Sequence, residues 1–271
     1  MKLTKPASIF PALILTACYH SPSPPPPPAI TLPSSVGSGQ GLDLATDASE
    51  VVNELKNSGV EFVARYYREP TSRWPALSAS EAQRLSSLGL KMVAVWESRS
   101  ERPSHFSYSS GYSDAMTAYW EARALGQPAG SAIYFAVDFN PRSWSLAPID
   151  QYFRGVAAGL AAASGGKPYY TVGVYGSGAV CDAVKGAGLA RYSWLSNSIA
   201  WEGSTSYADW NIMQGDRLPW LSFNHDSDQA KGEYGAFQLT GYTVASYVSA
   251  GPPDFVPPQI PTGRQSLTSL P

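Results

Sequence analysis

The sequence predicts an α/β fold, a TIM-like (β/α)8 barrel with irregular last βα units. Two observations lead to this prediction. Short segments rich in Val, Phe and Tyr alternate with helical segments from residue 41 onward, as in a series of right-handed βα units. Several of these segments are apolar throughout, which is typical of parallel strands that are covered on both faces. An open, doubly wound parallel sheet is the alternative.

Turn residues bound each expected strand. The strands are expected at residues 41–45, 61–67, 91–97, 132–139, 170–176, 192–197, 210–214 and 236–240. Between the first five, Asp47 with Glu50 and Ser78 with Glu81 form capping boxes that begin two helices. Further helices are expected at residues 113–125, 146–163 and 177–184. No helical period is visible in 198–209 or 215–235, so the last units are expected to be irregular.

Composition excludes several classes of protein. The chain has 271 residues, and 19 Lys and Arg face 21 Asp and Glu, which leaves no positive excess to neutralise a nucleic acid. A hydrophobic content of 44% is too high for a disordered chain, and two cysteines are too few for a disulfide scaffold. We therefore expect one globular domain, a monomer, with no nucleic-acid partner.

The N-terminal residues have the features of an export signal. Lys2 and Lys5 precede a short apolar stretch, and Leu15-Thr16-Ala17-Cys18 resembles the lipobox of bacterial lipoproteins, in which the cysteine is lipidated. An ordinary cleaved signal with an incidental cysteine is the alternative. The resemblance implies an exported lipoprotein, held by Cys18 at the outer membrane or the cell surface.

Proline content sets the domain boundaries. Five consecutive prolines at 24–28 predict an extended polyproline linker over residues 19–37, and the proline-rich residues 251–271 predict a tail. The predicted organisation is a lipoprotein signal peptide at 1–18, the linker, a barrel domain at 38–250 and the tail. Cys181 lies in a helical pattern and is expected to be a buried thiol.

Functional groups of a parallel barrel gather at the C-terminal ends of its strands. Read at those ends, the sequence offers Asp43, Arg65, Tyr66, Trp96, Glu97, Asp138, Tyr175, Asn197, Gln214 and Gln238. Three of these are acids on three of the first four strands. A turn or cap role is the alternative for Asp43 and Asp138, and an ion pair with Arg65 or Arg99 is the alternative for Glu97.

Paired carboxyl groups suit glycoside cleavage, because one donates a proton to the leaving oxygen while the other stabilises or attacks the developing oxocarbenium ion. Exposed aromatic rings suit sugar faces. The spacing of His20, His105 and His225 predicts no metal site, and no glycine-rich phosphate loop indicates a cofactor. Asp226 and Asp228 are expected in a solvated loop.

Several motifs in order resemble a known family. They are Gly41-Leu-Asp43, Phe62-Val-Ala-Arg65-Tyr66-Tyr67, Tyr134-Phe-Ala-Val-Asp138, Val172-Gly-Val-Tyr175-Gly and Trp194-Leu-Ser. Together they resemble the glycoside-hydrolase-like domain of unknown function in secreted bacterial proteins, a relative of the family 25 lysozymes. The resemblance spans about 41–240 and implies a TIM-like barrel whose groove faces cell-wall glycans. Where those lysozymes carry Asp-x-Glu, this chain reads Asp138-Phe139-Asn140, and an Asn cannot act as the acid.

Two function classes follow. The first is a surface-anchored, lysozyme-like hydrolase of peptidoglycan or another polysaccharide, with Asp138, Asp43 and Glu97 as the catalytic groups. Its substrate-binding residues would be Arg65, Tyr66, Trp96, Tyr175, Asn197, Gln214 and Gln238. The second is a non-catalytic glycan-binding module on a degenerate barrel, which the missing Glu favours. A structural lipoprotein whose acids serve only folding is a weaker third hypothesis.

Overall fold

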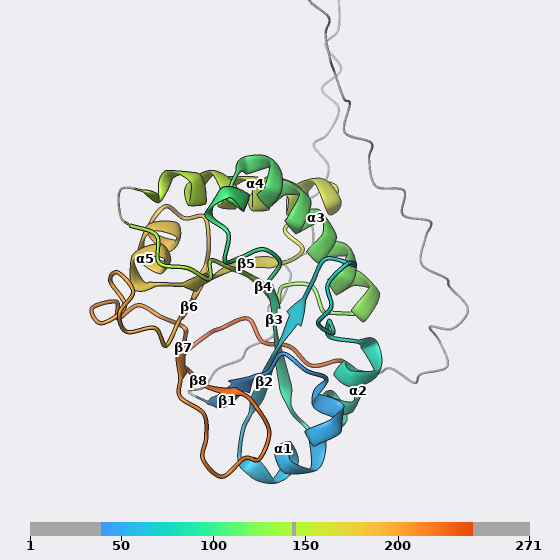
Figure 1. Cartoon of the computed structure of the whole chain (residues 1–271). Helices are drawn as coiled ribbons and strands as arrows, with labels where there is room; N and C mark the ends of the chain where they lie inside the picture. The colour runs from blue at the N-terminus through green and yellow to red at the C-terminus, as the bar shows by residue number, and fades with distance from the viewer. Residues whose placement is uncertain (1–38, 143–144, 241–271) are drawn as a thin grey trace, which may run out of the picture. The chain divides into compact units, whose positions relative to one another are not determined.

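The computed structural model describes residues 39–142 and 145–240, which contain a closed barrel of eight strands (Figure 1). Neighbouring strands run parallel from β1 to β7, whereas β8 runs antiparallel to both β7 and β1. The predicted barrel is therefore confirmed, with its last strand reversed. The strands are β1 (Gln40–Asp43), β2 (Phe62–Tyr67), β3 (Lys91–Trp96), β4 (Ala132–Ala136), β5 (Thr171–Gly176), β6 (Tyr192–Leu195), β7 (Ile212–Gly215) and β8 (Asp226–Ala230).

Helices follow each of the first five strands. As predicted, Ser78 Oγ accepts a hydrogen bond from the Glu81 amide at 3.1 Å to begin a helix. The third α-helix begins five residues before the predicted start, because Ser107 caps it there through the Ser110 amide. In the described residues no helix joins β6 to β7 or β7 to β8, which confirms the irregular last units. The helices are η1 (Ala48–Val51), α1 (Val52–Ser58), α2 (Ala79–Ser87), η2 (Pro103–His105), α3 (Tyr108–Leu125), α4 (Ala147–Ala163) and α5 (Gly178–Gly186).

The eighth strand was expected at 236–240, and this prediction is wrong. Those residues make only an isolated bridge, in which Phe237 and Met92 exchange backbone hydrogen bonds of 2.7 and 2.9 Å near the start of β3. The barrel is closed instead by Asp226–Ala230, a polar stretch that an apolar pattern does not mark. Ser227 and Gln229 lie on the outer face of β8, where no helix of the described residues joins β7 to β8, so this face needs no apolar side chains. Asp226 and Asp228 alternate with them on the inner face.

The barrel interior is filled by aromatic rings. Phe62, Tyr134, Trp194 and Tyr234 are buried inside it, and the Tyr134 hydroxyl donates to the Tyr234 carbonyl at 2.9 Å. Gly173 makes room for the Tyr134 ring, since a Cβ on this glycine would lie 2.5 Å from that ring. These rings close the barrel beneath its C-terminal rim, so a cavity can form only above them.

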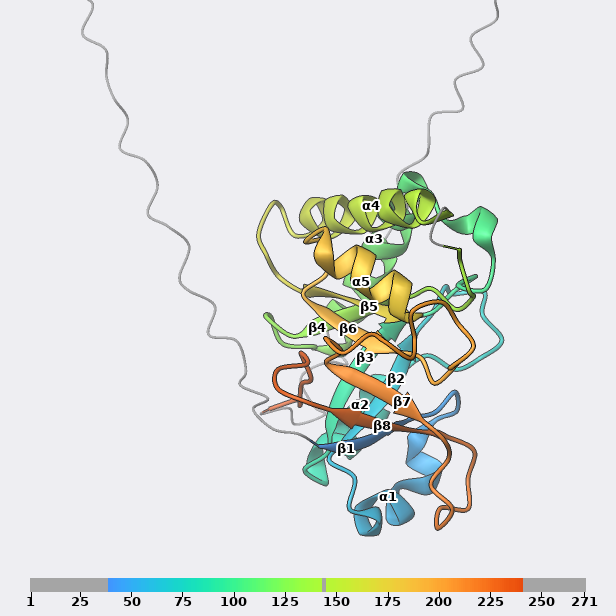
Figure 2. The same cartoon turned by 90° about the vertical axis from the view of Figure 1, so that its left-hand side faces the viewer.

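Helices α3 and α4 lie side by side on the outside of the barrel (Figures 1 and 2). Glycines at their contact allow this approach, because a Cβ on Gly155 would lie 2.0 Å from the Tyr108 carbonyl oxygen. No helix in the described ranges is long and apolar enough to cross a bilayer. The predicted signal peptide with Cys18, the linker and the tail lie outside the described residues.

Candidate active site

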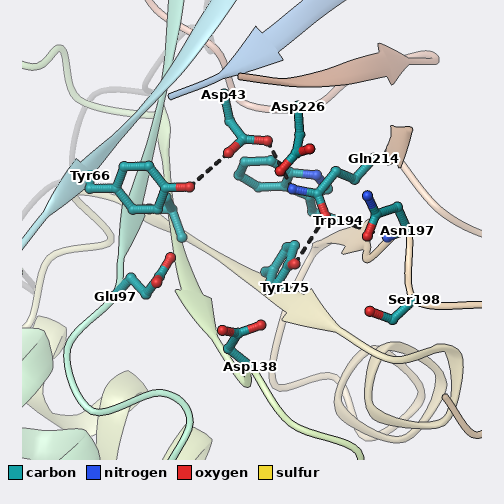
Figure 3. A pocket seen from close by; sticks show the side chains of 11 residues that line it. Asp43, Tyr66, Glu97, Asp138, Tyr175, Trp194, Asn197, Ser198, Gln214 and Asp226 are labelled. Carbon is teal, nitrogen blue, oxygen red and sulfur yellow. Dashed lines mark hydrogen bonds between the residues drawn. The ribbon is translucent and has the colours of Figure 1, made fainter. Parts of the chain in front are cut away.

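A pocket of about 240 Å³ opens at the C-terminal rim of the barrel (Figure 3). Asp43 and Tyr66 reach it from the ends of β1 and β2, and Glu97 and Asp138 from the residues just after β3 and β4. Because β8 is antiparallel, its first residue, Asp226, reaches the same rim. The lining residues are Asp43, Tyr66, Val95, Glu97, Asp138, Tyr175, Trp194, Asn197, Ser198, Gln214 and Asp226.

Asp43 is fixed by hydrogen bonds to both of its carboxylate oxygens. The Tyr66 hydroxyl donates to Oδ1 at 2.7 Å, and Gln214 Nε2 donates to Oδ2 at 2.9 Å. The Tyr175 hydroxyl in turn donates to Gln214 Oε1 at 3.0 Å, which orients that amide (Figure 3). Burial is the main reason why the pKa of Asp43 is raised to about 6, and the charge of Asp226 raises it further. The two hydrogen bonds act in the opposite direction and lower this pKa. Asp43 is thus an oriented carboxylate at neutral pH.

Glu97 combines a raised pKa with a carboxyl group that the described residues do not orient by hydrogen bonds. Its side chain makes no hydrogen bond to the described residues, while its amide donates to the Tyr67 carbonyl at 3.1 Å. Burial raises the pKa of Glu97 to about 7; the nearby Arg68 cation lowers it, and the charges of Asp138 and Asp43 raise it. Glu97 can therefore hold its proton at a pH where an ordinary glutamate is ionised.

Asp138 completes the set of acids that point into this space (Figure 3). Burial raises its pKa, and the charge of Glu101 adds to the effect. Its amide donates to the Ser100 carbonyl at 3.0 Å, so the loop after β3 holds the residue that follows β4. The four carboxyl groups of Asp43, Glu97, Asp138 and Asp226 thus meet at one opening.

The structure brings together most of the residues that the sequence selected. Tyr66, Tyr175, Asn197 and Gln214 line the pocket with the three acids. The ion pairs offered as the alternative for Glu97 are absent from the described residues, because Arg65 pairs with Glu81 and Arg99 pairs with Glu69.

Three selected residues lie elsewhere. Arg65 alternates with Ala64 and Tyr66 on β2 and points outward, where it is buried, pairs with Glu81 and donates to the Leu44 carbonyl at 2.8 Å. Trp96 also points outward, into the core between strands and helices. Gln238 follows the bridge to Met92, at the opposite end of the barrel from the pocket. These placements correct the expected substrate-binding roles of Arg65, Trp96 and Gln238.

Sequence reasoning missed two acids inside the barrel. Asp226 lines the pocket, and Asp228 lies one inward position deeper on β8. Burial raises the pKa of Asp228 well above its usual value, and the charge of Asp43 raises it further. The Trp194 indole N–H faces this carboxyl group and opposes the shift, although the two lack hydrogen-bond geometry. The alternation Asp226-Ser-Asp228-Gln-Ala230 is the signal that could have identified an inward face.

Asn140 serves the fold. Its Oδ1 accepts a hydrogen bond from the Glu202 amide at 2.9 Å, so it ties the end of the β4 segment to the loop after β6. It is not among the residues that line the pocket. Within the described ranges no group of three His, Cys, Asp or Glu residues could hold a metal ion.

Comparisons with known proteins agree on the fold. The family described as "Rv2525c-like, glycoside hydrolase-like domain" matches residues 53–244. The chain is 30% identical over 168 residues to the uncharacterized protein YbfG of Bacillus subtilis, over 59% of this chain and 23% of that protein. It spans about a quarter of the length of the curated relatives it matches.

Two solved structures share the architecture. The Tat-secreted protein Rv2525c of Mycobacterium tuberculosis gives a TM-score of 0.60 at 24% identity, covering 73% of this chain and 98% of that chain. An uncharacterized protein of B. stearothermophilus gives a TM-score of 0.52 at 17% identity, covering 71% of this chain and 95% of that chain.

Proposed function

Because the chain belongs to the Rv2525c-like, glycoside hydrolase-like family, we propose that its pocket binds a cell-wall or other extracellular glycan and hydrolyses a glycosidic bond. The observation that carries this proposal is the convergence of Asp43, Glu97 and Asp138, each with a raised pKa, on one opening. Clusters of perturbed acids in a cleft are typical of catalytic sites.

The environments of the three acids suggest different roles. Glu97, with a pKa of about 7, donates its proton to the departing glycosidic oxygen. Asp138 is the partner carboxylate that stabilises or attacks the developing oxocarbenium ion. Asp43, held by Tyr66 and Gln214, contributes a fixed negative charge and orients the sugar. These roles leave Asn140 outside the reaction, so the loss of the lysozyme Glu at that position does not by itself forbid catalysis.

The full chain should be incubated with purified peptidoglycan, and both released reducing ends and bound protein should be measured. Asp138→Asn is expected to lower release at least about 100-fold while binding changes little, because the mutation removes a charge needed chiefly in the transition state. Asp182→Asn, the same chemical change on the exposed face of α5, is the matched control and should leave both quantities unchanged.

A non-catalytic glycan-binding module is the second candidate, and the position of Asn140 favours it. That side chain is engaged in a structural hydrogen bond at the position where the resembled lysozymes carry their acid. Binding of peptidoglycan without release of reducing ends, and with no effect of Asp138→Asn on binding, would select this candidate over the hydrolase.

We also propose that the protein is exported and anchored to the cell envelope through acylated Cys18. The support comes from Lys2, Lys5 and the lipobox-like Leu15-Thr16-Ala17-Cys18. Cys18→Ser should move the protein from the membrane fraction to the soluble fraction of the producing cell and prevent its labelling by a fatty acid. Labelling and membrane retention that persist in Cys18→Ser would contradict the anchor.

A further inference from the structure

A second concave region, the arginine groove, adjoins the pocket. It has a volume of about 550 Å³ and lies between the loops that follow β2 and β3. Glu97 lines both the pocket and the groove, so the two hollows share a wall. The arginine groove is defined by Arg68, Arg73, Trp74, Glu97, Arg99 and Arg102, with the serines and acids between them.

Two of the four arginines in the groove are neutralised. Arg99 pairs with Glu69 at 2.8 Å, and Arg102 pairs with Glu101 at 3.2 Å. Arg68 and Arg73 form no ion pair with any acid in the described part of the chain. Glu97 is the third acid of the groove, so the groove keeps two positive charges for a ligand when Glu97 is protonated and one when Glu97 is ionised. The chain as a whole has a net charge of −2.

Arg68 is held in place with donor capacity unused. It is only 8% exposed, its guanidinium lies 4.4 Å from the centre of the Tyr66 ring, and Nη1 donates to the Glu97 carbonyl at 3.2 Å. Its Nε is buried with no hydrogen-bond partner. A buried donor without a partner costs free energy, and the Arg68 side chain that carries this donor lines the groove.

Trp74 supplies an apolar platform beside this charge. The ring is 47% exposed, and the Arg73 guanidinium lies 5.6 Å from its centre. An exposed tryptophan next to an arginine offers one surface for the C–H face of a sugar and one for an anionic oxygen. Both residues lie in the loop after β2 and not in a strand of the barrel.

The backbone of the groove is tied to the candidate catalytic groups. The Glu69 amide donates to Ser98 Oγ at 2.9 Å, and Ser100 accepts from the Asp138 amide at 3.0 Å. Between these two serines, Arg99 has a φ of 58°, a left-handed conformation that is strained for a residue with a side chain. Since Glu97 lines both hollows, a ligand in the groove would lie beside this carboxyl group.

We propose that the arginine groove binds a carboxylate carried by the sugar that adjoins the one in the pocket, so that the protein selects acidic glycans. Arginine is suited to this task because its planar fork matches a carboxylate with two parallel hydrogen bonds. Trp74 stacks on the same sugar, and Arg73 and Arg68 supply the charge. This inference rests on the proposed function only in placing a glycan in the pocket.

The test compares two forms of one ligand on the full chain. The probes are peptide-free glycan strands of peptidoglycan, which carry lactyl carboxylates, and the same strands with those carboxyls reduced to alcohols. We expect the charged strands to bind about tenfold more tightly, the value of one charge-assisted hydrogen bond. Arg73→Gln should remove most of that preference and leave binding of the reduced strands unchanged, whereas Trp74→Ala should weaken both.

Arg154→Gln, on the exposed side of α4, is the matched charge control and should have no effect. The proposal would be overturned if Arg154→Gln lost the charge preference as fully as Arg73→Gln does. It would also be overturned if the charged and reduced strands bound equally well, or not at all, and hexuronate oligomers showed no carboxylate preference either. Selective binding of hexuronate oligomers alone would keep the carboxylate site and assign its source to a uronate. Failure to release reducing ends, with the charge preference intact, would contradict the proposed hydrolysis only.

Discussion

At the scale of single residues, the proposed reaction requires that Asp43 and Glu97 in the pocket differ in protonation. The pKa of Asp43 is raised to about 6 and that of Glu97 to about 7, both chiefly by burial. The proposed reaction needs Asp43 in its ionised form, which predominates above the pKa of Asp43. It needs Glu97 in its protonated form, which predominates below the pKa of Glu97. We therefore expect kcat/KM to rise as the pH approaches about 6 and to fall above about 7, a narrow bell measured as release of reducing ends. A rate that stays level through about pH 8 would exclude Glu97 as the acid.

Tyr66 offers a way to shift one side of that profile. Its hydroxyl donates to Asp43 at 2.7 Å and so lowers the pKa of this carboxyl. Tyr66→Phe removes the hydrogen bond, so the pKa of Asp43 should rise and the acidic limb of the pH profile should shift to higher pH. The alkaline limb should stay in place. An unchanged acidic limb would mean that another group titrates there.

Arg65 and Glu81 should matter for stability alone. Both side chains are almost fully buried, and together they form an ion pair behind β2. Glu81→Ala leaves the Arg65 cation buried without its partner and should lower the free energy of unfolding by about 3–5 kcal/mol. Denaturant unfolding checks this value. Glu69→Ala, which removes the acid from the exposed pair with Arg99, should cost less than about 1 kcal/mol.

The identity of Arg65 as a structural residue could not be predicted from the end of its strand. Side chains on a strand alternate between two faces, and only one face of a barrel strand reaches the pocket. Tyr66 and Arg65 are neighbours in sequence but point to opposite sides. Since both faces of β2 are buried, hydropathy alone does not distinguish the inner from the outer set.

At the level of elements, the early βα units were predictable because several signals coincide in each. Apolar strands, side-chain caps such as Ser78 and glycines such as Gly59, with φ 82°, mark both ends of the helices. The closing strand β8 carries none of these signals. Asp226 and Asp228 made it look like a solvated loop, yet Asp226 reaches the pocket because the strand is reversed.

The packing of α3 on α4 gives a test of element geometry. A Cβ on Gly155 would lie 2.0 Å from the Tyr108 carbonyl, so Gly155→Ala must push the helices apart. We expect a loss of at least about 1–3 kcal/mol in the free energy of unfolding, the usual cost of overpacking. Gly186→Ala is the matched control, because nothing lies within 4 Å of a Cβ there. It should be neutral or slightly stabilising, and an equal loss in both variants would contradict the close helix contact.

At the level of the whole molecule, the acids at the strand ends could be predicted because the order of the strands places them together. The groove between the loops could not be predicted in this way. Parallel strands bring their C-terminal ends to one rim, so the meeting of Asp43, Glu97 and Asp138 followed from strand order. The arginine groove could not be foreseen, because it forms between two loops with no periodic pattern. Its charges come from residues 68–73 and 99–102, which only the folded chain places together.

The proposed acid catalysis is tested most directly by comparing the full chain with its Glu97→Gln variant on peptidoglycan. Both the release of reducing ends and the amount of bound protein should be measured. The wild-type chain should release reducing ends, and the variant should bind equally well but react at least about 100-fold more slowly, since Gln cannot donate the proton. Equal release by both chains, or binding with no release by the wild type, would contradict catalysis by this carboxyl group.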